Sequence, residues 1–301
     1  MAAPPSDAYT TPFQLTKSMH RDVYSAIDPA TNKELSATDK VIIVFGATSG
    51  LGFATAKSWN TAGAKGIVLV GRNSEGLQKA EKDLAAKSEV LSITADVGSV
   101  ADTDAVFKKT LEKFGRVDVV VTAFGAMAVA PVGAQEPAAW WENFEVNTKG
   151  VYHVAHSYIT VAGGNGTLIN MVSLAASFVA PGMSGYSASK LAVIRLGEIL
   201  DVEQPGLRVF SIHPGIVIAE NGRGAVFEPF RPFTHDTAAL TGGLTTYLAT
   251  PKADFLKGGY LHANWDVVEL EKHKDEIVEK KLAKLAFLNG QLGPEGHPWS
   301  S

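Results

Sequence analysis

The hydrophobic residues of this chain fall into short continuous runs rather than alternating patterns. The clearest run is Val41–Phe45, where five apolar residues follow one another. A run of this kind is typical of a strand that is buried on both faces of a parallel sheet. Similar runs lie at residues 66–70, 90–93, 117–121, 167–172 and 207–212. The pattern therefore predicts the strands of one buried sheet.

Segments of helical length separate the earlier runs, for example residues 77–87 and 101–114. Strands that alternate with helices form parallel sheets, because right-handed crossovers place the helices on both faces. No glycine-rich or proline-rich linker divides residues 40–262. We therefore expect an α/β fold with one domain over these residues, a single Rossmann-like, doubly wound parallel sheet with helices on both faces.

The two ends of the chain differ from this central domain. Residues 1–39 form a largely polar N-terminal extension, whose few apolar residues either tie it to the domain or leave it partly disordered. Residues 263–301 form a C-terminal helical extension, because segment 266–289 carries apolar residues such as Ile277 and Leu282 among many Glu and Lys. Periodicity shows a buried face without naming its partner, so this helix packs either on its own subunit or on a neighbour.

Composition limits the classes of function. The chain has 301 residues, 46% of them hydrophobic, with a formal net charge of -4 and no cysteine. It lacks the basic field that attracts nucleic acid or an anionic membrane surface, and no apolar run approaches the roughly 20 residues of a membrane span. The absence of cysteine excludes thiol catalysis and cysteine-bound metals. We expect a cytoplasmic protein with a small-molecule partner and no metal site.

A glycine-rich turn follows the first strand, and an alanine-rich helix begins within it. Glycines let the chain turn sharply, let the backbone approach a pyrophosphate, and let helix and strand pack closely. The phosphates of a dinucleotide would meet the positive N-terminal end of the helix. The residues predicted to bind the cofactor in this turn are Gly46, Thr48, Ser49, Gly50, Leu51 and Gly52. An ordinary glycine-rich turn is the alternative interpretation.

The end of the second strand predicts which cofactor is bound. Arg72 lies twenty residues after Gly52 and is followed by Asn73. An acidic residue here would accept hydrogen bonds from the ribose of NAD, whereas a guanidinium can bind the 2′-phosphate of NADP. Arg72 therefore favours NADP(H) over NAD(H), with a solvated surface arginine as the alternative.

Tyr186 and Lys190 lie four residues apart at the start of an apolar helical stretch, so their side chains project from one face. A tyrosine with an ordinary pKa of about 10 is a poor acid, but an adjacent ammonium favours the phenolate. The pair is a candidate proton donor. This short motif also arises by chance and gains meaning only from the residues upstream.

Together these motifs resemble the short-chain dehydrogenase/reductase family over about residues 40–262. Tyr186 and Lys190 match the Tyr-x-x-x-Lys element of its catalytic tetrad. Ser173, thirteen residues earlier, matches the serine, and Asn147 matches the helix-borne asparagine. The resemblance also implies cofactor contacts from Tyr186, Lys190, Arg72, Asn73, Asp96, Val97, Phe124, Gly125, Pro214, Gly215 and Val217. It further implies a homodimer or a homotetramer.

The resemblance implies an NADP(H)-dependent oxidoreductase that acts on C=O or CH-OH groups. Tyr186 would donate a proton to the carbonyl oxygen held by Ser173, while hydride arrives from the nicotinamide. Lys190 would bind the nicotinamide ribose, and Asn147 would position a water that relays protons to the lysine. Pro214-Gly215 matches a Pro-Gly turn that lies beside the nicotinamide in the family. His213 adjoins this turn, and a role for it in the chemistry is a weaker hypothesis than a structural role.

Two departures from the family pattern concern the cofactor surroundings. Phe124 replaces a small residue and is expected to narrow or shift the site, and Ala219 stands where a threonine often binds the carboxamide. They leave two other functions open. One is a non-redox isomerase or cyclase that uses the same tetrad for acid-base chemistry, and the other is a regulator that binds the cofactor without catalysis.

The segment 220–236 resembles a substrate lid because it is rich in phenylalanine and proline. An aromatic loop over a redox centre would exclude water and favour an apolar or aromatic substrate. The predicted substrate residues are Met127, Phe227 and Phe230. A structural surface loop is the alternative.

Overall fold

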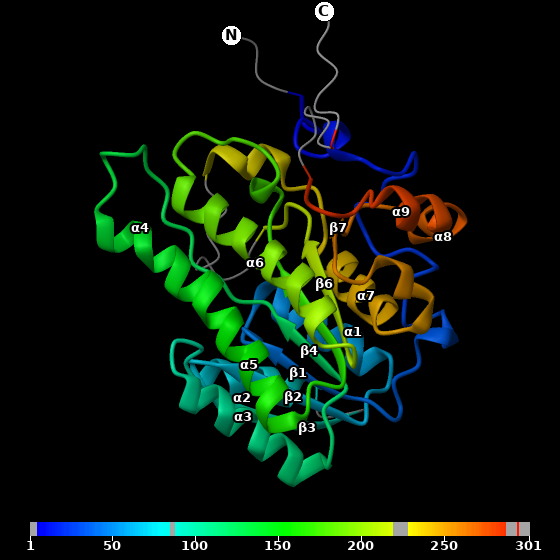
Figure 1. Cartoon of the computed structure of the whole chain (residues 1–301). Helices are drawn as coiled ribbons and strands as arrows, with labels where there is room; N and C mark the ends of the chain where they lie inside the picture. The colour runs from blue at the N-terminus through cyan, green and yellow to red at the C-terminus, as the bar shows by residue number, and fades with distance from the viewer. Residues whose placement is uncertain (1–4, 85–87, 219–227, 287–293, 295–301) are drawn as a thin grey trace, which may run out of the picture.

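The computed structural model describes residues 5–84, 88–218, 228–286 and 294, and its centre is a parallel sheet of seven strands in the order β3-β2-β1-β4-β5-β6-β7 (Figure 1). Every neighbouring pair of strands is parallel. The strands are β1 (Val41–Phe45), β2 (Gly66–Gly71), β3 (Glu89–Thr94), β4 (Val119–Thr122), β5 (Gly166–Met171), β6 (Leu207–His213) and β7 (Gly259–His262). The predicted doubly wound fold is confirmed.

The continuous apolar runs became strands because both of their faces are covered. All five residues of β1 are fully buried. Alternate β1 side chains enter the two large cores, with Ile42 and Val44 in one and Val41, Ile43 and Phe45 in the other. This two-sided burial is why the strand carries no polar alternation. The seventh strand, β7, was not predicted from the sequence.

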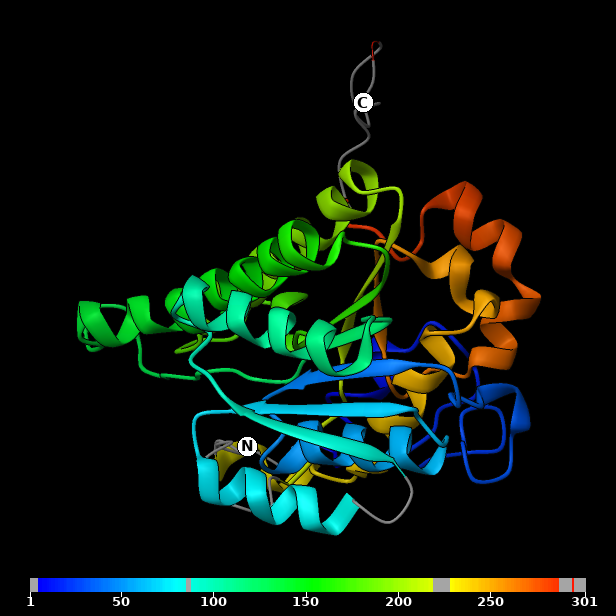
Figure 2. The same ribbon diagram turned by 90° about the horizontal axis from the view of Figure 1, so that it is seen from below.

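Helices cover both faces of the sheet (Figure 2). They are α1 (Gly50–Thr61), α2 (Ser74–Leu84), α3 (Val100–Phe114), α4 (Pro137–Phe144), α5 (Gly150–Ala162), α6 (Ser184–Glu203), α7 (Ala238–Leu248), α8 (Val267–Lys272) and α9 (Lys274–Lys280). The core on one face takes side chains from α1, α2 and α7, and the core on the other takes them from α3, α5 and α6. A π-helical turn, Glu145–Lys149, joins α4 to α5.

The C-terminal part differs from the predicted single helix over residues 266–289. It forms two short helices, α8 and α9, because His273 leaves helical geometry at φ -108 and ψ 17. Lys281 then ends α9 in the left-handed conformation, at φ 53. Leu270 and Ile277 are buried in the same core of this chain. Positions buried seven residues apart are compatible with one helix or with two that pack on the same core, so periodicity alone could not separate them.

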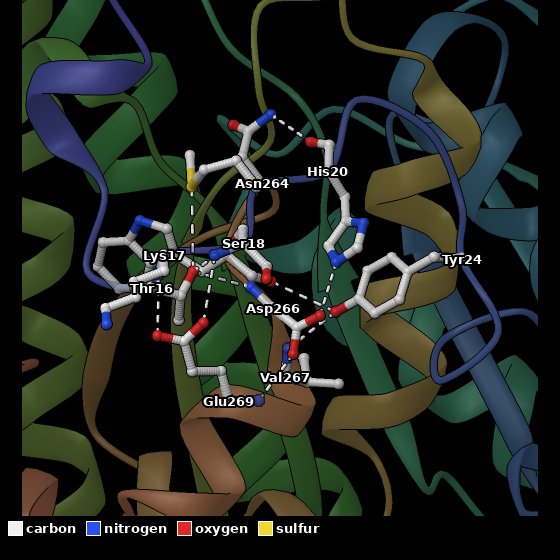
Figure 3. Close-up of polar contacts among 11 residues, drawn as sticks. Thr16, Lys17, Ser18, His20, Tyr24, Asn264, Asp266, Val267 and Glu269 are labelled. Carbon is white, nitrogen blue, oxygen red and sulfur yellow. Dashed lines mark hydrogen bonds and ion pairs between the residues drawn. The ribbon is translucent and has the colours of Figure 1, made fainter.

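The described part of the N-terminal segment packs against α8 (Figure 3). The carboxylate of Glu269 accepts hydrogen bonds from the backbone N–H groups of Lys17 and Ser18, at 2.8 and 3.2 Å. The His20 ring donates to Asp266 at 2.7 Å. These contacts join residues that lie 246 to 252 positions apart in the sequence, and they fix the segment to the domain.

Neither a membrane-crossing helix nor a cluster of metal-ligating side chains is present in the described residues. None of the helices there is both long enough and apolar enough to span a bilayer. In the same residues no group of three or more His, Cys, Asp or Glu side chains could hold a metal ion.

Candidate active site

The predicted site residues gather at the carboxyl edge of the sheet, where the order of the strands reverses between β1 and β4. In open α/β sheets this reversal leaves a crevice where ligands bind. The turn after β1 and the segment after β4 touch there: a Cβ on Gly46 would lie 2.7 Å from the carbonyl oxygen of Ala123. Only glycine fits at this crossing, and its φ of 86 also favours glycine.

The glycine turn has the shape of a phosphate cradle. Gly50 begins α1 with φ 52, and no atom lies within 4 Å of the point where its Cβ would stand. Gly52 packs directly on the backbone of Gly46, whose carbonyl carbon would lie 2.8 Å from an added Cβ. The side chain of Ser49 makes no capping hydrogen bond to the helix. Open space in front of a helix N-terminus fits an anionic group.

Arg72 is exposed directly after β2, and its side chain makes no hydrogen bond or ion pair with any other described residue. Its guanidinium is therefore available to a ligand. Asn73 has a local structural role, since its Oδ1 accepts a hydrogen bond from Gly76 N–H at 3.1 Å in the first turn of α2. Asp96 is exposed after β3, and its Oδ1 accepts from Gly98 N–H at 2.8 Å.

Phe124 is accommodated by packing against its neighbours. A Cβ on Gly150 would lie 3.1 Å from the Phe124 ring and 2.9 Å from the Val97 side chain. The ring thus occupies space that this helical glycine leaves open, and it belongs to the edges of two hydrophobic cores. Gly125 is exposed, and its absent Cβ would lie 3.1 Å from Asn147 Oδ1 and 3.4 Å from Lys190 Nζ. Two predicted catalytic residues therefore meet at Gly125.

Asn147 is fully buried within the π-helical turn. Its Oδ1 accepts from Ala126 N–H at 2.8 Å, and its Nδ2 donates to Ala126 O and to Ser189 Oγ, both at 2.9 Å. π-Helical turns often occur at functional sites. Both amide hydrogens of Asn147 are engaged, so its side chain holds the strand-end segment next to α6.

Ser173 and Tyr186 face each other from two elements. Ser173 caps the short 3₁₀ turn Leu174–Ala176 after β5, with its Oγ accepting from Ala175 N–H at 3.2 Å. Tyr186 lies in the first turn of α6. Burial raises the pKa of Tyr186, and a hydrogen bond with Ser173 lowers it in part. The phenol is therefore protonated at neutral pH.

Lys190 lies one turn further along α6 and is 4% exposed. Its Nζ donates to Met171 O at 2.9 Å and lies 6.0 Å from the centre of the Tyr186 ring. Burial lowers the pKa of Lys190 to about 8. The sequence predicted that this ammonium would favour the Tyr186 phenolate, but burial dominates the tyrosine pKa, and the hydrogen bond that lowers it comes from Ser173 rather than Lys190.

His213, at the end of β6, supports the segment that carries Ser173. Its Nδ1 accepts a hydrogen bond from Leu174 N–H at 3.1 Å. Burial lowers its pKa to about 3, so the imidazole is neutral and can act as this acceptor. The ring of His262 packs edge-on against it, with centroids 4.9 Å apart. A structural role therefore explains its position beside the Pro-Gly turn.

The Pro214-Gly215 turn is held by residues that the sequence did not single out. Thr241 Oγ1 donates to Pro214 O at 2.6 Å, and Asp236 Oδ2 accepts from Ile216 N–H at 2.6 Å. Val217 follows, half-buried. Ala219 and Phe227 lie outside the described residues.

The predicted substrate residues are only partly brought together. Met127 and Phe230 are both half-buried. Phe230 lies in the 3₁₀ helix Glu228–Phe233, and its ring centroid is 4.8 Å from that of Tyr9. Tyr9 also contacts Phe178, on the loop after Ser173, at 6.0 Å. The N-terminal segment thus completes an aromatic cluster, which sequence reasoning missed because no local pattern links these residues.

Comparison with known proteins identifies the family of the chain. The family model described as short chain dehydrogenase matches residues 40–225. The short chain dehydrogenase mpl6 of Monascus purpureus is 35% identical over 303 residues, covering 96% of this chain and 100% of that protein. The short chain dehydrogenase andI of Emericella variicolor is 30% identical over 276 residues, covering 87% and 92%.

Among solved structures, actinorhodin polyketide ketoreductase with NADPH matches with a TM-score of 0.68 and 25% identity, over 75% of this chain and 97% of that one. Levodione reductase matches with a TM-score of 0.69 and 25% identity, over 76% and 97%. The family model covers more than half of the chain and the fungal relative nearly all of it, and the fold agrees with both. The chain belongs to the short-chain dehydrogenase family.

Proposed function

We propose that this oxidoreductase uses NADPH to reduce a ketone or other carbonyl group of an apolar or aromatic small molecule, or catalyses the reverse reaction. The observation that carries the proposal is the arrangement around Tyr186: its phenol hydrogen-bonds Ser173, and Lys190, which borders Gly125, lies 6.0 Å from its ring centre. When bound, the cofactor supplies the hydride. The Tyr186 phenol, protonated at neutral pH, donates the proton to the carbonyl oxygen.

The other three residues of the tetrad hold the substrate, the cofactor and the backbone beside them in position. The Ser173 hydroxyl hydrogen-bonds the carbonyl oxygen that Tyr186 protonates. An ammonium has three hydrogens and Lys190 uses one for Met171 O, so others remain for the nicotinamide ribose. Asn147 holds the backbone of Ala126 and so keeps Gly125 beside the lysine. Both amide hydrogens of Asn147 are engaged. Any water that Asn147 positions must therefore donate a hydrogen bond to an oxygen atom of Asn147.

Arg72 supports NADPH as the cofactor. The Arg72 guanidinium has no partner among the described residues, and no acidic residue stands at the end of β2. The structurally similar actinorhodin polyketide ketoreductase was solved with NADPH, which supports NADPH as the cofactor. The aromatic cluster beyond Ser173, formed by Tyr9, Phe178 and Phe230, supports an apolar or aromatic substrate.

The reaction is tested by mixing purified protein with NADPH and a panel of aromatic and aliphatic ketones, and following the loss of NADPH absorbance. Tyr186→Phe should lower kcat by about 10²- to 10⁴-fold, the usual contribution of a general acid. Tyr152→Phe is the matched control, because Tyr152 is 53% exposed on α5 and outside the site. Full activity of Tyr186→Phe would overturn the mechanism. Substrate turnover without net NADPH consumption would instead indicate an isomerase or cyclase, and cofactor binding without turnover a regulator.

The cofactor preference has its own test. Arg72→Ala should raise the Kd for NADPH by about 10- to 100-fold, the value of a hydrogen bond to a charged group, and leave the Kd for NADH unchanged. Lys82→Ala on the exposed side of α2 controls for general loss of positive charge. Equal affinities of the unchanged protein for NADPH and NADH would refute the preference.

A further inference from the structure

A buried carboxylate connects the N-terminal segment to the Pro214-Gly215 turn. The side chain of Asp236 is 1% exposed. Its Oδ2 accepts a hydrogen bond from Ile216 N–H at 2.6 Å. Its Oδ1 accepts from Arg21 Nη1 at 3.0 Å and from Asn264 Nδ2 at 2.9 Å. One side chain thus links the turn, the segment after β7 and the N-terminal segment.

The three partners of Asp236 are all donors, and this determines which residue can stand there. A carboxylate offers two acceptor oxygens, one toward Ile216 and one toward Arg21 and Asn264. An amide of the same shape would have to point its NH₂ group at one of these donors. A buried carboxylate also requires a cationic partner, and Arg21 supplies it.

The turn is fixed closely against this carboxylate. Gly215 has φ 84, and a Cβ there would lie 2.6 Å from Asp236 Oδ2. The backbone N–H of Asp236 also donates to Ile216 O, at 3.3 Å. The conformation of Ile216 is therefore held from both its N–H and its C=O by one residue.

The N-terminal segment holds this region through more than the ion pair. Arg21 O accepts from Thr237 N–H at 2.8 Å, and Asp22 Oδ1 accepts from Thr237 Oγ1 at 2.5 Å. Asn264 Nδ2 additionally donates to His20 O at 2.9 Å (Figure 3). The backbone on both sides of Arg21 is thus fixed by Thr237, which follows Asp236 in sequence, and by Asn264, which also binds the Asp236 carboxylate.

We propose that Arg21 and Asp236 are positioning residues for the Pro214–Ile216 turn, so that the N-terminal segment forms part of the nicotinamide end of the cofactor site. Arg21 binds one carboxylate oxygen and leaves the other directed at Ile216 N–H. The following amide, of Val217, is thereby held at the crevice. The link to the nicotinamide rests on the proposed function, whereas the effect on the turn does not.

The fungal relative and the solved structures cover different shares of this chain, which agrees with a role of the N-terminal segment that the common fold does not require. The alignment to the Monascus purpureus relative covers 96% of this chain, so it reaches well into the terminal segments. The two solved reductase structures each match over 97% of their own length but only 75% and 76% of this chain. The common fold is thus complete without about a quarter of this chain. The contact between Arg21 and Asp236 is therefore compatible with a feature that this fold does not need.

The first test is hydrogen exchange on the free protein. Arg21→Met keeps the length of the side chain and removes its charge, and Asp236→Asn keeps the shape and removes one acceptor. Both should speed exchange of the Ile216 amide by at least about 10-fold, since its hydrogen bond is lost or shared. Arg21→Lys should keep most of the protection. His20→Gln is the matched control, because it alters a neighbouring side-chain contact of the same segment, to Asp266, without touching the turn.

The second test separates the two ends of the cofactor. We expect Arg21→Met to raise the Kd for NADPH by about 10-fold and to leave the Kd for 2′-phospho-ADP-ribose, which lacks nicotinamide, within about twofold of the unchanged protein. Arg21→Lys should restore NADPH affinity, and His20→Gln should alter neither Kd.

Unchanged Ile216 exchange in Arg21→Met and Asp236→Asn, or equal weakening of both ligands, would overturn the proposal. If the unchanged protein binds neither ligand, the proposed function fails, and the exchange result alone then decides whether Arg21 and Asp236 fix the turn.

Discussion

Lys190 carries an ammonium that is almost fully buried, and this affects stability as well as chemistry. Burial lowers its pKa from 10.5 in an unfolded chain to about 8. Below pH 8 the lysine is protonated in both states, and folding bears the full cost of burying the charge. Between pH 8 and 10.5 the unfolded chain binds a proton that the folded chain lacks, so the free energy of unfolding rises with pH in this window.

Lys190→Met removes a catalytic residue and should be inactive. Because it also removes the buried ammonium, it should change how the free energy of unfolding depends on pH. Relative to this variant, the unchanged protein should gain about 3 kcal/mol of unfolding free energy between pH 7 and pH 10.5. Urea unfolding of both proteins at pH 7, 9 and 10.5 measures the difference, and every other titrating group is common to the two. Parallel pH profiles would show that the lysine titrates normally in the fold.

At the scale of the elements, α1 and α7 pack closely through small residues. A Cβ on Gly242 would collide with Ser58 Oγ and lie 2.9 Å from Ala54 O, a backbone atom that cannot rotate away. Helix propensity alone would make Gly242→Ala stabilising by about 1 kcal/mol. Because the helices must separate, we expect a net loss of about 2 kcal/mol, measured by thermal or urea unfolding.

Gly115→Ala is the comparison for that substitution. Gly115 ends α3 with φ 75 and has no atom within 4 Å of its Cβ position. Only backbone strain opposes alanine there, so the cost should be about 1 kcal/mol. A Gly242→Ala protein that is more stable than the unchanged protein would show that α1 and α7 can move apart freely.

The same elements show what the sequence could and could not predict. Six strands were predicted because most of their residues are apolar and, except in the edge strand β3, buried. The candidate catalytic residues were singled out because their spacing follows from strand ends and one helix face. Helix α7 was not predicted, because its glycines and threonines favour close packing and give little apolar periodicity. Asp236 and Arg21 lie 215 residues apart, so only the folded chain brings them together.

For the whole molecule, the N-terminal segment contributes two separable groups of contacts. Residues 5–14 supply surface contacts: the Tyr9 ring, and Phe13, whose carbonyl accepts a hydrogen bond from Trp265 Nε1 at 3.0 Å. Residues 15–39 supply core contacts, since Ile27 and Leu35 are buried in the main core and Arg21 neutralises Asp236. Removing the first group should therefore cost much less stability than removing both.

A chain that begins at Leu15 should fold and lose about 1–2 kcal/mol, with its largest change in KM for aromatic ketones, because Tyr9 no longer covers Phe178 and Phe230. A chain that begins at Lys40 lacks Ile27 and Leu35, whose burial in the core is worth about 4 kcal/mol together, and leaves Asp236 without its cation, worth about 3–5 kcal/mol. The sum is comparable to the whole net stability of a typical domain, so this chain should be largely unfolded at 25 °C. Circular dichroism and urea unfolding of both chains measure this, and a cooperative transition of the Lys40 chain close to that of the full protein would show that the sheet and its helices are stable without the segment.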